Sequence, residues 1–194
     1  MKAIIPVAGA GTKLRPHTYT QPKALIPIAG KTVLSIIIEQ LQDAGVQEFI
    51  FITGYLGEKI QDYIKESFPT ISSTFVNQSE RQGLGHAILL SREQVNGDDV
   101  IIVLGDTICE YNIKEVLDSK DSMLAVKKVD DPRNFGVAEI DEDGKVLKVV
   151  AATMSAVTTA AAVVAIVVVA ATAMATAMAT TAATAAAEVA TAAE

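Results

Sequence analysis

A glycine-rich loop followed by basic side chains is the part of this sequence best suited to chemistry. Residues 8–13 (AGAGTK) directly follow the apolar run at residues 3–7, and Arg15 and Lys23 come shortly afterwards. Glycine lets a backbone approach a ligand closely and turn its N–H groups outward, while basic side chains supply charged donors. This combination predicts a polyphosphate-binding site.

Two common phosphate-binding motifs do not fit this loop. A P-loop has the form G-x-x-x-x-G-K-S/T, and a dinucleotide-binding loop needs a small residue where this chain has Leu14. Judged from the loop alone, an ordinary glycine turn with solvated lysines is an equally good interpretation. The choice between them depends on the rest of the chain.

Apolar strands alternate with amphipathic helices up to about residue 150. Strands that are continuous apolar runs between helices indicate a mainly parallel sheet covered on both faces, and ligands of such sheets bind at the carboxyl ends of the strands. The glycine loop and Asp106 both follow apolar strands in this way. We expect strands at residues 3–7, 48–53, 73–76, 100–104, 123–128, 137–140 and 145–150, and helices at 33–44, 58–67, 86–95 and 113–117.

Four segments in a fixed order carry a family resemblance. The glycine loop continues into GTKLRP (11–16), PKALIPI (22–28) and Gly30-Lys31, and later come QGLGHA (82–87), LGD (104–106) and DPRNFGV (131–137). This order resembles that of the sugar-1-phosphate nucleotidyltransferases (NDP-sugar pyrophosphorylases), whose later segments bind the base, the metal and the sugar. The resemblance implies an α/β fold, a Rossmann-like three-layer sandwich with a mainly parallel, mixed sheet of the nucleotidyltransferase (GT-A-like) type.

The resemblance also implies a reaction. A nucleoside triphosphate and a sugar 1-phosphate would give an NDP-sugar and pyrophosphate, with Mg²⁺ as cofactor. The QGLGHA segment leans towards UTP or dTTP, and we take glucose 1-phosphate as the sugar substrate. The nearest enzymatic alternative is a mannose-1-phosphate guanylyltransferase, and the alternative from another class is a non-catalytic nucleotide or sugar-nucleotide sensor of the same fold.

Individual roles follow from the same resemblance. Lys13 and Lys23 would hold the phosphates and stabilise charge on the departing pyrophosphate, and Asp106 would bind Mg²⁺. Gln78 would read the edge of a pyrimidine, and Gly136 would offer its N–H to the sugar. The other implied nucleotide contacts are Ala8, Gly9, Gly11, Thr12 and Gly83.

Five further residues near these segments receive lesser roles. Arg15 is assigned to ordering the loop or reaching phosphate, while His17 and His86 are interpreted as structural, the latter by packing or capping. Cys109 has no histidine arranged beside it and is interpreted as inert. Glu110 is interpreted as a solvated loop carboxylate.

The chain departs from the family pattern at three places. Lys13 stands where the family has arginine, which gives up the planar bidentate fork of a guanidinium. Thr32 stands where proline is usual. Directly after Val150 the family has Glu-Lys-Pro, whose glutamate would bind sugar hydroxyls and whose lysine would bind the sugar phosphate, whereas this chain continues with alanines.

The composition changes abruptly at that last departure. Residues 151–194 are about half alanine, with Thr and Val next, and they contain almost none of the residues that form turns. A membrane span, a low-complexity linker, or letters that do not represent the true residues would each explain this, and we favour the last. We therefore assign residues 1–150 to a nucleotidyltransferase core and residues 151–194 to the remainder of the same domain, and draw no function from side chains beyond Val150.

Net charge and cysteine content limit the partners that the protein can bind and the compartment in which we expect it. The 194 residues carry a net charge of −7, so the chain as a whole is not attracted to nucleic acid or to an anionic membrane. A single cysteine excludes an intrachain disulfide and fits a reducing compartment. No signal-peptide pattern opens the chain, so we expect a cytoplasmic protein. A homo-oligomer is compatible with the sequence, because apolar residues at an interface follow the same pattern as core residues.

Overall fold

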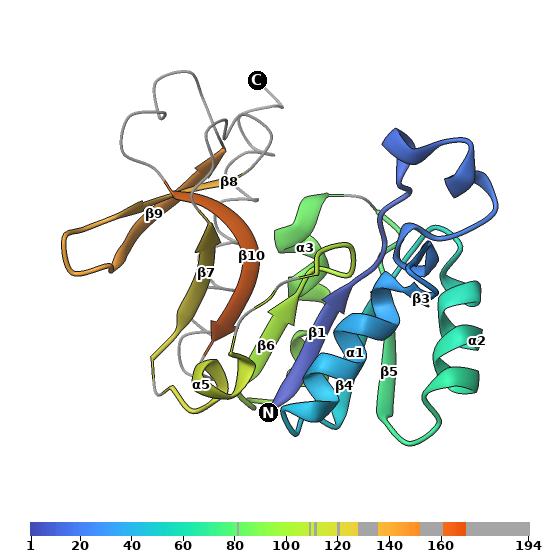
Figure 1. Cartoon of the computed structure of the whole chain (residues 1–194), viewed down its shortest axis with the longest axis horizontal. Coiled ribbons are helices and arrows are strands. Elements are labelled where there is room, and N and C mark those ends of the chain that lie inside the picture. Colours follow the sequence, from blue (N-terminus) through green and yellow to red (C-terminus); the bar gives the residue numbers. More distant parts are fainter. Residues whose placement is uncertain are drawn as a thin grey trace.

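The sheet of this α/β fold has a parallel half and an antiparallel half, which lie on the right and left of Figure 1. The structure is a computed structural model, and it describes residues 1–80, 82–108, 110, 112–119, 121–127, 136–151 and 161–169. The two halves meet between strands β6 and β10. The expected mixed sheet is confirmed.

The parallel half is built around the first strand of the chain. β1 (Lys2–Pro6) lies between β4 (Glu48–Thr53) and β6 (Val100–Val103), and β5 (Ser72–Asn77) pairs with the far edge of β4. All of these pairings are parallel. The carboxyl ends of these four strands therefore point to the same edge of the sheet.

The antiparallel half contains four strands within the described residues. β10 (Ala161–Val169) pairs with β6 and β8 (Gly136–Ile140) along one edge and with β7 (Met123–Lys127) along the other. β9 (Val146–Ala151) pairs with β8 through a tight turn. The alanine-rich composition had indicated no element for residues 161–169, yet they form an inner strand of the sheet.

Helices cover both faces of the parallel half, which gives three layers. Successive side chains of a strand point to opposite faces, so Ile5 packs with α1 (Val33–Asp43) and α2 (Gly57–Ser67), whereas Ile4 packs on the other face. That other face is covered by α3 (Gly83–Leu90) and α4 (Arg92–Val95). The short helix α5 (Ile113–Leu117) packs on the same side as α1.

Within the described residues, no helix is both long enough and apolar enough to cross a membrane.

The boundaries of α1 have clear local causes. Thr32 caps the helix, because its Oγ1 accepts a hydrogen bond from the backbone N–H of Ser35 at 3.0 Å. The helix ends at Asp43, and Gly45 closes it off, because its φ of +99° lets the next N–H, that of Val46, reach the carbonyl of Leu41 at 3.0 Å. The departure from the family pattern at Thr32 therefore supplies a helix cap.

The expected helix at 86–95 begins earlier and is interrupted. It starts at Gly83, whose φ of +91° lets the chain turn into α3, and it breaks at Ser91. The hydroxyl of Ser91, which is fully buried, donates to the carbonyl of Ile88 at 2.6 Å. The other expected boundaries agree with the structure within about one residue. Three short 3₁₀ helices and a small hairpin were not expected. They are η1 (Thr12–Leu14), η2 (His17–Tyr19), η3 (Lys23–Leu25), and the hairpin of β2 (Pro27–Ile28) with β3 (Lys31–Thr32).

A charged cluster holds the start of β1. The ammonium of Lys2 lies 2.9 Å from Asp98 Oδ2 and 4.0 Å from Glu48 Oε2, and donates to the carbonyl of Gln94 at 2.9 Å. The hydrogen bond from Lys2, reinforced by its charge, lowers the pKa of the Asp98 carboxyl. A lowered folded-state pKa means that the charged carboxylate stabilises the fold above the unfolded pKa, and that this contribution is lost as pH falls through the folded value.

We expect Asp98→Asn to destabilise the protein near pH 7 and to have progressively less effect below about pH 4, where Asp98 becomes protonated in the unfolded and then in the folded state. Urea unfolding of wild type and variant at pH 7, 5 and 3 measures this difference. Asp62→Asn, at an exposed position of α2, is the matched control. An Asp98→Asn effect that stays constant over this pH range would contradict the assignment.

Candidate functional site

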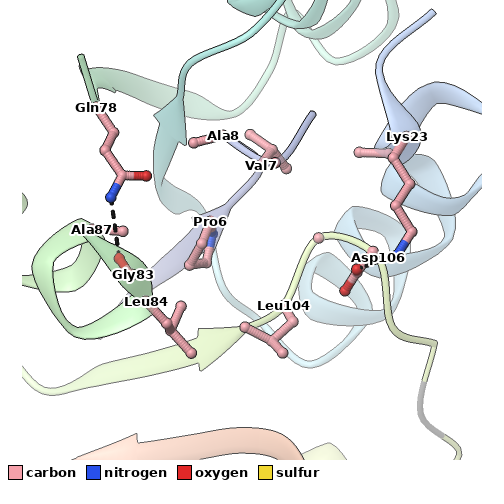
Figure 2. A pocket seen from close by; sticks show the side chains of 13 residues that line it. Pro6, Val7, Ala8, Lys23, Gln78, Gly83, Leu84, Ala87, Leu104 and Asp106 are labelled. Carbon is pink, nitrogen blue, oxygen red and sulfur yellow. Dashed lines mark hydrogen bonds and ion pairs between the residues drawn. The ribbon is translucent and has the colours of Figure 1, made fainter. Parts of the chain in front are cut away.

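One cavity of about 390 Å³ lies where the carboxyl ends of β1 and β6 meet the start of α3 (Figure 2). Its walls come from the end of β1 and the loop after it, from η3, from the segment between β5 and α3, and from the end of β6. The residues that line it are Pro6, Val7, Ala8, Gly9, Lys23, Ala24, Gln78, Gly83, Leu84, Ala87, Leu104, Gly105 and Asp106.

A charged pair marks one end of the cavity. The ammonium of Lys23 lies 2.5 Å from Asp106 Oδ2, and the two side chains are 39% and 40% exposed. The other carboxylate oxygen, Oδ1, accepts a hydrogen bond from the hydroxyl of Thr107 at 3.1 Å. Because both members of the pair are accessible, an incoming anion can engage the ammonium and an incoming cation the carboxylate.

Backbone donors line the adjacent loop. Ala8 is buried and Gly9 is exposed, and both border the cavity. Within the part of the chain that the structure describes, no acceptor is found for the N–H groups of Ala8, Gly9, Ala10 and Gly11. Such a run of unpaired N–H groups next to a lysine can bind an anion.

The shape of this loop depends on a contact between Thr18 and Gly11. Thr18 is 1% exposed, and its hydroxyl donates to the carbonyl of Gly11 at 2.7 Å. Gly11 has a φ of +57°, and a Cβ added there would lie 2.8 Å from Thr18 Cγ2. The position therefore requires glycine both for its backbone conformation and for the close approach.

Further contacts hold the chain between the loop and Lys23. The hydroxyl of Tyr55 donates to the carbonyl of Tyr19 at 3.0 Å, and the ammonium of Lys59 donates to the carbonyl of Thr20 at 2.6 Å. The Arg15 guanidinium lies 5.0 Å from the centre of the Tyr19 ring. The expected role of Arg15 in ordering the loop stays a prediction, and this ring contact is the one that the structure gives for its guanidinium among the described residues.

A glycine allows Asp106 to lie close to β1. The N–H of Gly105 donates to the carbonyl of Pro6 at 3.2 Å, and a Cβ on Gly105 would lie 2.3 Å from Val7 Cγ1. Any side chain here would force the two strand ends apart. The glycine of the LGD segment therefore brings the carboxylate to the same edge as the loop.

Gln78 occupies the opposite end of the cavity and is 8% exposed. Its amide nitrogen donates to the carbonyl of Gly83 at 3.1 Å and lies 3.3 Å from Nδ1 of His86 (Figure 2 shows the first of these contacts). The apolar side chains of Leu84 and Ala87 border the cavity beside it. This end offers apolar surface together with one oriented amide.

The cavity brings together six of the residues expected at the site and leaves out four. Lys13 is exposed on η1 and does not border the cavity, and Gly136 begins β8 in the antiparallel half of the sheet. Residues 131–135 of the expected sugar-binding segment, and Cys109, lie outside the described residues. Those that line the cavity are Ala8, Gly9, Lys23, Gln78, Gly83 and Asp106, and those that do not are Gly11, Thr12, Lys13 and Gly136.

Sequence reasoning missed the apolar lining and the position of His86. Ala24, Leu84 and Leu104 have apolar side chains of the kind that also fill cores, so no pattern separates them from core residues. His86 was interpreted as a packing or capping residue, whereas its ring contacts the Gln78 amide. The position of His86 in the QGLGHA segment was the sequence feature that could have indicated this contact.

A family model and several known proteins match most of this chain. The family model described as nucleotidyl transferase matches residues 2–151. The bifunctional protein GlmU of Methanococcus maripaludis is 41% identical over 150 residues, which cover 77% of this chain and 35% of that protein. The glucose-1-phosphate thymidylyltransferase of Streptomyces griseus is 35% identical over 153 residues, covering 76% of this chain and 43% of that protein.

Solved structures agree with the fold. A UDP-glucose pyrophosphorylase complexed with UDP-glucose superposes with a TM-score of 0.76 at 24% identity, covering 87% of this chain and 75% of that one. At that identity the likeness concerns the fold alone. The chain spans about a third of the length of the archaeal GlmU proteins that it matches.

The contact between Thr18 and Gly11 predicts the effect of a substitution. Thr18→Val keeps the shape of the side chain but removes the hydroxyl, so we expect a loss of about 1 kcal/mol in the free energy of unfolding. Urea unfolding measures this loss. Thr18→Ser keeps the hydroxyl and is the control; if it cost more than the valine variant, the hydrogen bond would not be the feature that holds the loop.

Proposed function

Because the chain belongs to the nucleotidyl transferase family, we propose that it transfers a nucleotidyl group from a nucleoside triphosphate to a sugar 1-phosphate and releases pyrophosphate. UTP or dTTP and glucose 1-phosphate are the favoured substrates. Relatives named glucose-1-phosphate thymidylyltransferase and UTP–glucose-1-phosphate uridylyltransferase, at 35% and 30% identity, support this choice. The proposal concerns the activity of the whole protein.

The observation that carries the proposal is the arrangement of one cavity. The Lys23–Asp106 pair lies at one end, Gln78 at the other, and the loop of unpaired N–H groups borders the space between them. Charged and backbone donors suit the triphosphate, and an amide beside apolar side chains suits a base. A nucleoside triphosphate has the matching order of groups, with charged phosphates at one end and a base at the other.

The chemistry asks mainly for positioning and for neutralisation of charge. An oxygen of the sugar phosphate attacks the α-phosphorus, the bond from that phosphorus to the bridging oxygen breaks, and pyrophosphate leaves with the electron pair. Lys23 would stabilise the charge that develops on pyrophosphate, and the N–H groups of Gly9 and Gly11 would hold the phosphates. Lys13, on the exposed side of the same loop, would attract the outer phosphates, and Thr12 would add a backbone donor.

Asp106 fits the magnesium ion that this family generally uses. It is the one carboxylate among the residues that line the cavity, and its partner Lys23 already places positive charge against it. Mg²⁺ commonly takes one or two protein carboxylates and completes its shell with phosphate oxygens and water, so a single carboxylate beside bound phosphates suits this ion. When bound, the ion would supply charge neutralisation at the phosphates.

The remaining parts of the proposal concern the sugar and the setting. We propose that the sugar 1-phosphate approaches from the side of the antiparallel half, where Gly136 begins β8. A cytoplasmic location and a homo-oligomer are proposed with it. A guanylyltransferase and a sensor without turnover are the outcomes that the following experiment separates from this function.

Pyrophosphate release by the full-length protein, measured over a panel of nucleoside triphosphates and sugar 1-phosphates with Mg²⁺, tests the proposal. We expect turnover with UTP or dTTP, and we expect Lys23→Met and Asp106→Asn each to lower kcat/KM by about 100- to 1,000-fold. Lys65→Met and Asp62→Asn, both at exposed positions of α2, are matched controls that should keep wild-type rates.

Three other outcomes would contradict parts of this proposal. Nucleotide binding without turnover on any substrate pair would favour the sensor. Turnover with GTP and mannose 1-phosphate alone would favour the guanylyltransferase. Full activity in both Lys23→Met and Asp106→Asn would show that the reaction does not take place in this cavity.

A further inference from the structure

We propose that Lys23 and Asp106 mask each other, so that the cavity discriminates against a polyphosphate without a metal ion and against a metal ion alone. This rests on the proposed function in one respect, namely that the ligand of the cavity carries phosphates. It concerns the form in which that ligand binds, and it does not require that a nucleotidyl group is transferred.

Each member of the pair engages its partner with the kind of charge that a ligand would bring. The Lys23 ammonium lies 2.5 Å from Asp106 Oδ2, and among the described residues no other acceptor contacts this ammonium. Figure 2 shows the two side chains directed towards one another, at the end of the cavity away from Gln78. The ammonium therefore plays for the carboxylate the part of a metal cation, and the carboxylate plays for the ammonium the part of a phosphate.

The other oxygen of Asp106 is also engaged. Its Oδ1 accepts a hydrogen bond from the hydroxyl of Thr107 at 3.1 Å. A cation that binds this carboxylate has to displace the ammonium or share the carboxylate with it, and two positive charges at one carboxylate repel each other. Lys23 consequently weakens the binding of any free cation to Asp106.

The charges of the pair cancel within the cavity lining. Lys23 and Asp106 are the two charged residues among those that line the cavity, one of each sign. A polyphosphate without metal would gain the ammonium, but it would leave the carboxylate unpaired beside its own negative charge. A metal-complexed polyphosphate offers oxygens to the ammonium and a cation to the carboxylate, so both charges keep a partner when the pair separates.

The pair can separate without any movement of the backbone. The backbone at Gly105 is bonded to the end of β1, which fixes the start of Asp106, and Ala24 and Leu25 beside Lys23 are buried. A lysine has a flexible stem and three donors that rotate freely. The exchange from one partner to another therefore needs only new side-chain rotamers.

Mutual masking predicts that each substitution improves the binding of the other residue's ligand. Removal of Asp106 would free the ammonium for metal-free phosphates, and removal of Lys23 would free the carboxylate for a cation. Two groups that only bind their own ligands, without masking each other, would give losses alone. Since both side chains are more than a third exposed, we expect gains of about three- to fivefold and no more.

Dissociation constants of UTP for the full-length protein, measured by displacement of a fluorescent nucleotide, test the masking of Lys23. For Asp106→Asn we expect UTP to bind about three- to fivefold more tightly than to wild type in EDTA, and more weakly than to wild type in excess Mg²⁺. Glu110→Gln removes the same charge from an exposed position outside the cavity lining and should show no such reversal.

Binding of Mn²⁺ alone, measured from the electron paramagnetic resonance signal of the free ion, tests the masking of Asp106. For Lys23→Met we expect about three- to fivefold tighter Mn²⁺ binding than for wild type. The double variant Lys23→Met/Asp106→Asn should lack this gain, because the gain acts through the carboxylate. Lys13→Met removes a lysine of the loop that does not border the cavity and is the control for general charge effects.

The outcomes separate the masking from the proposed function. Metal-free UTP that binds Asp106→Asn no more tightly than wild type would overturn the masking, even in an active transferase, and so would Mn²⁺ binding that is unchanged in Lys23→Met. Equal gains in Glu110→Gln or Lys13→Met would overturn it as well. Both expected gains in a protein without turnover would support the masking while contradicting the proposed function.

Discussion

The parallel pairing of β1 with β4 on one side and β6 on the other is the constraint on which the pocket depends. Because neighbouring parallel strands end at the same edge, the loop after β1 and the carboxylate after β6 meet there. Gly105 permits the two strand ends to touch. A Cβ at that position would lie 2.3 Å from Val7 Cγ1 and 3.0 Å from the carbonyl oxygen of Pro6, so these strand ends could not stay as close.

The Lys23–Asp106 pair then joins parts of the chain that are 83 residues apart. Exposed ion pairs contribute only about 0–1 kcal/mol to folding, so the fold does not depend on this one. The segment that carries Lys23 is held instead by hydrogen bonds to backbone carbonyls, among them those of Thr18 to Gly11 and of Lys59 to Thr20. The charged groups are therefore placed by the fold and kept accessible to a ligand.

Much of this architecture could be predicted from sequence, for a physical reason. Strands buried on both faces are continuous apolar runs, so β4 and β6 were predicted within one residue. The pairing of β10 could not be predicted, because a short apolar run of Ala, Val and Ile fits a buried helix as well as a strand. Motif order located Lys23 and Gln78, but it did not place Lys13 outside the cavity or His86 against Gln78. Those two facts depend on the path of η1 and on the early start of α3, which are tertiary features.

A crystal structure of the full-length protein with a non-hydrolysable UTP analogue and Mg²⁺ tests the central claim most directly. The account predicts the triphosphate between the loop after β1 and Asp106, with Lys23 turned from the carboxylate to a phosphate. It also predicts the base beside Gln78, at the opposite end of the cavity. A nucleotide bound outside this cavity, or one with its base at the Lys23 end, would contradict the account.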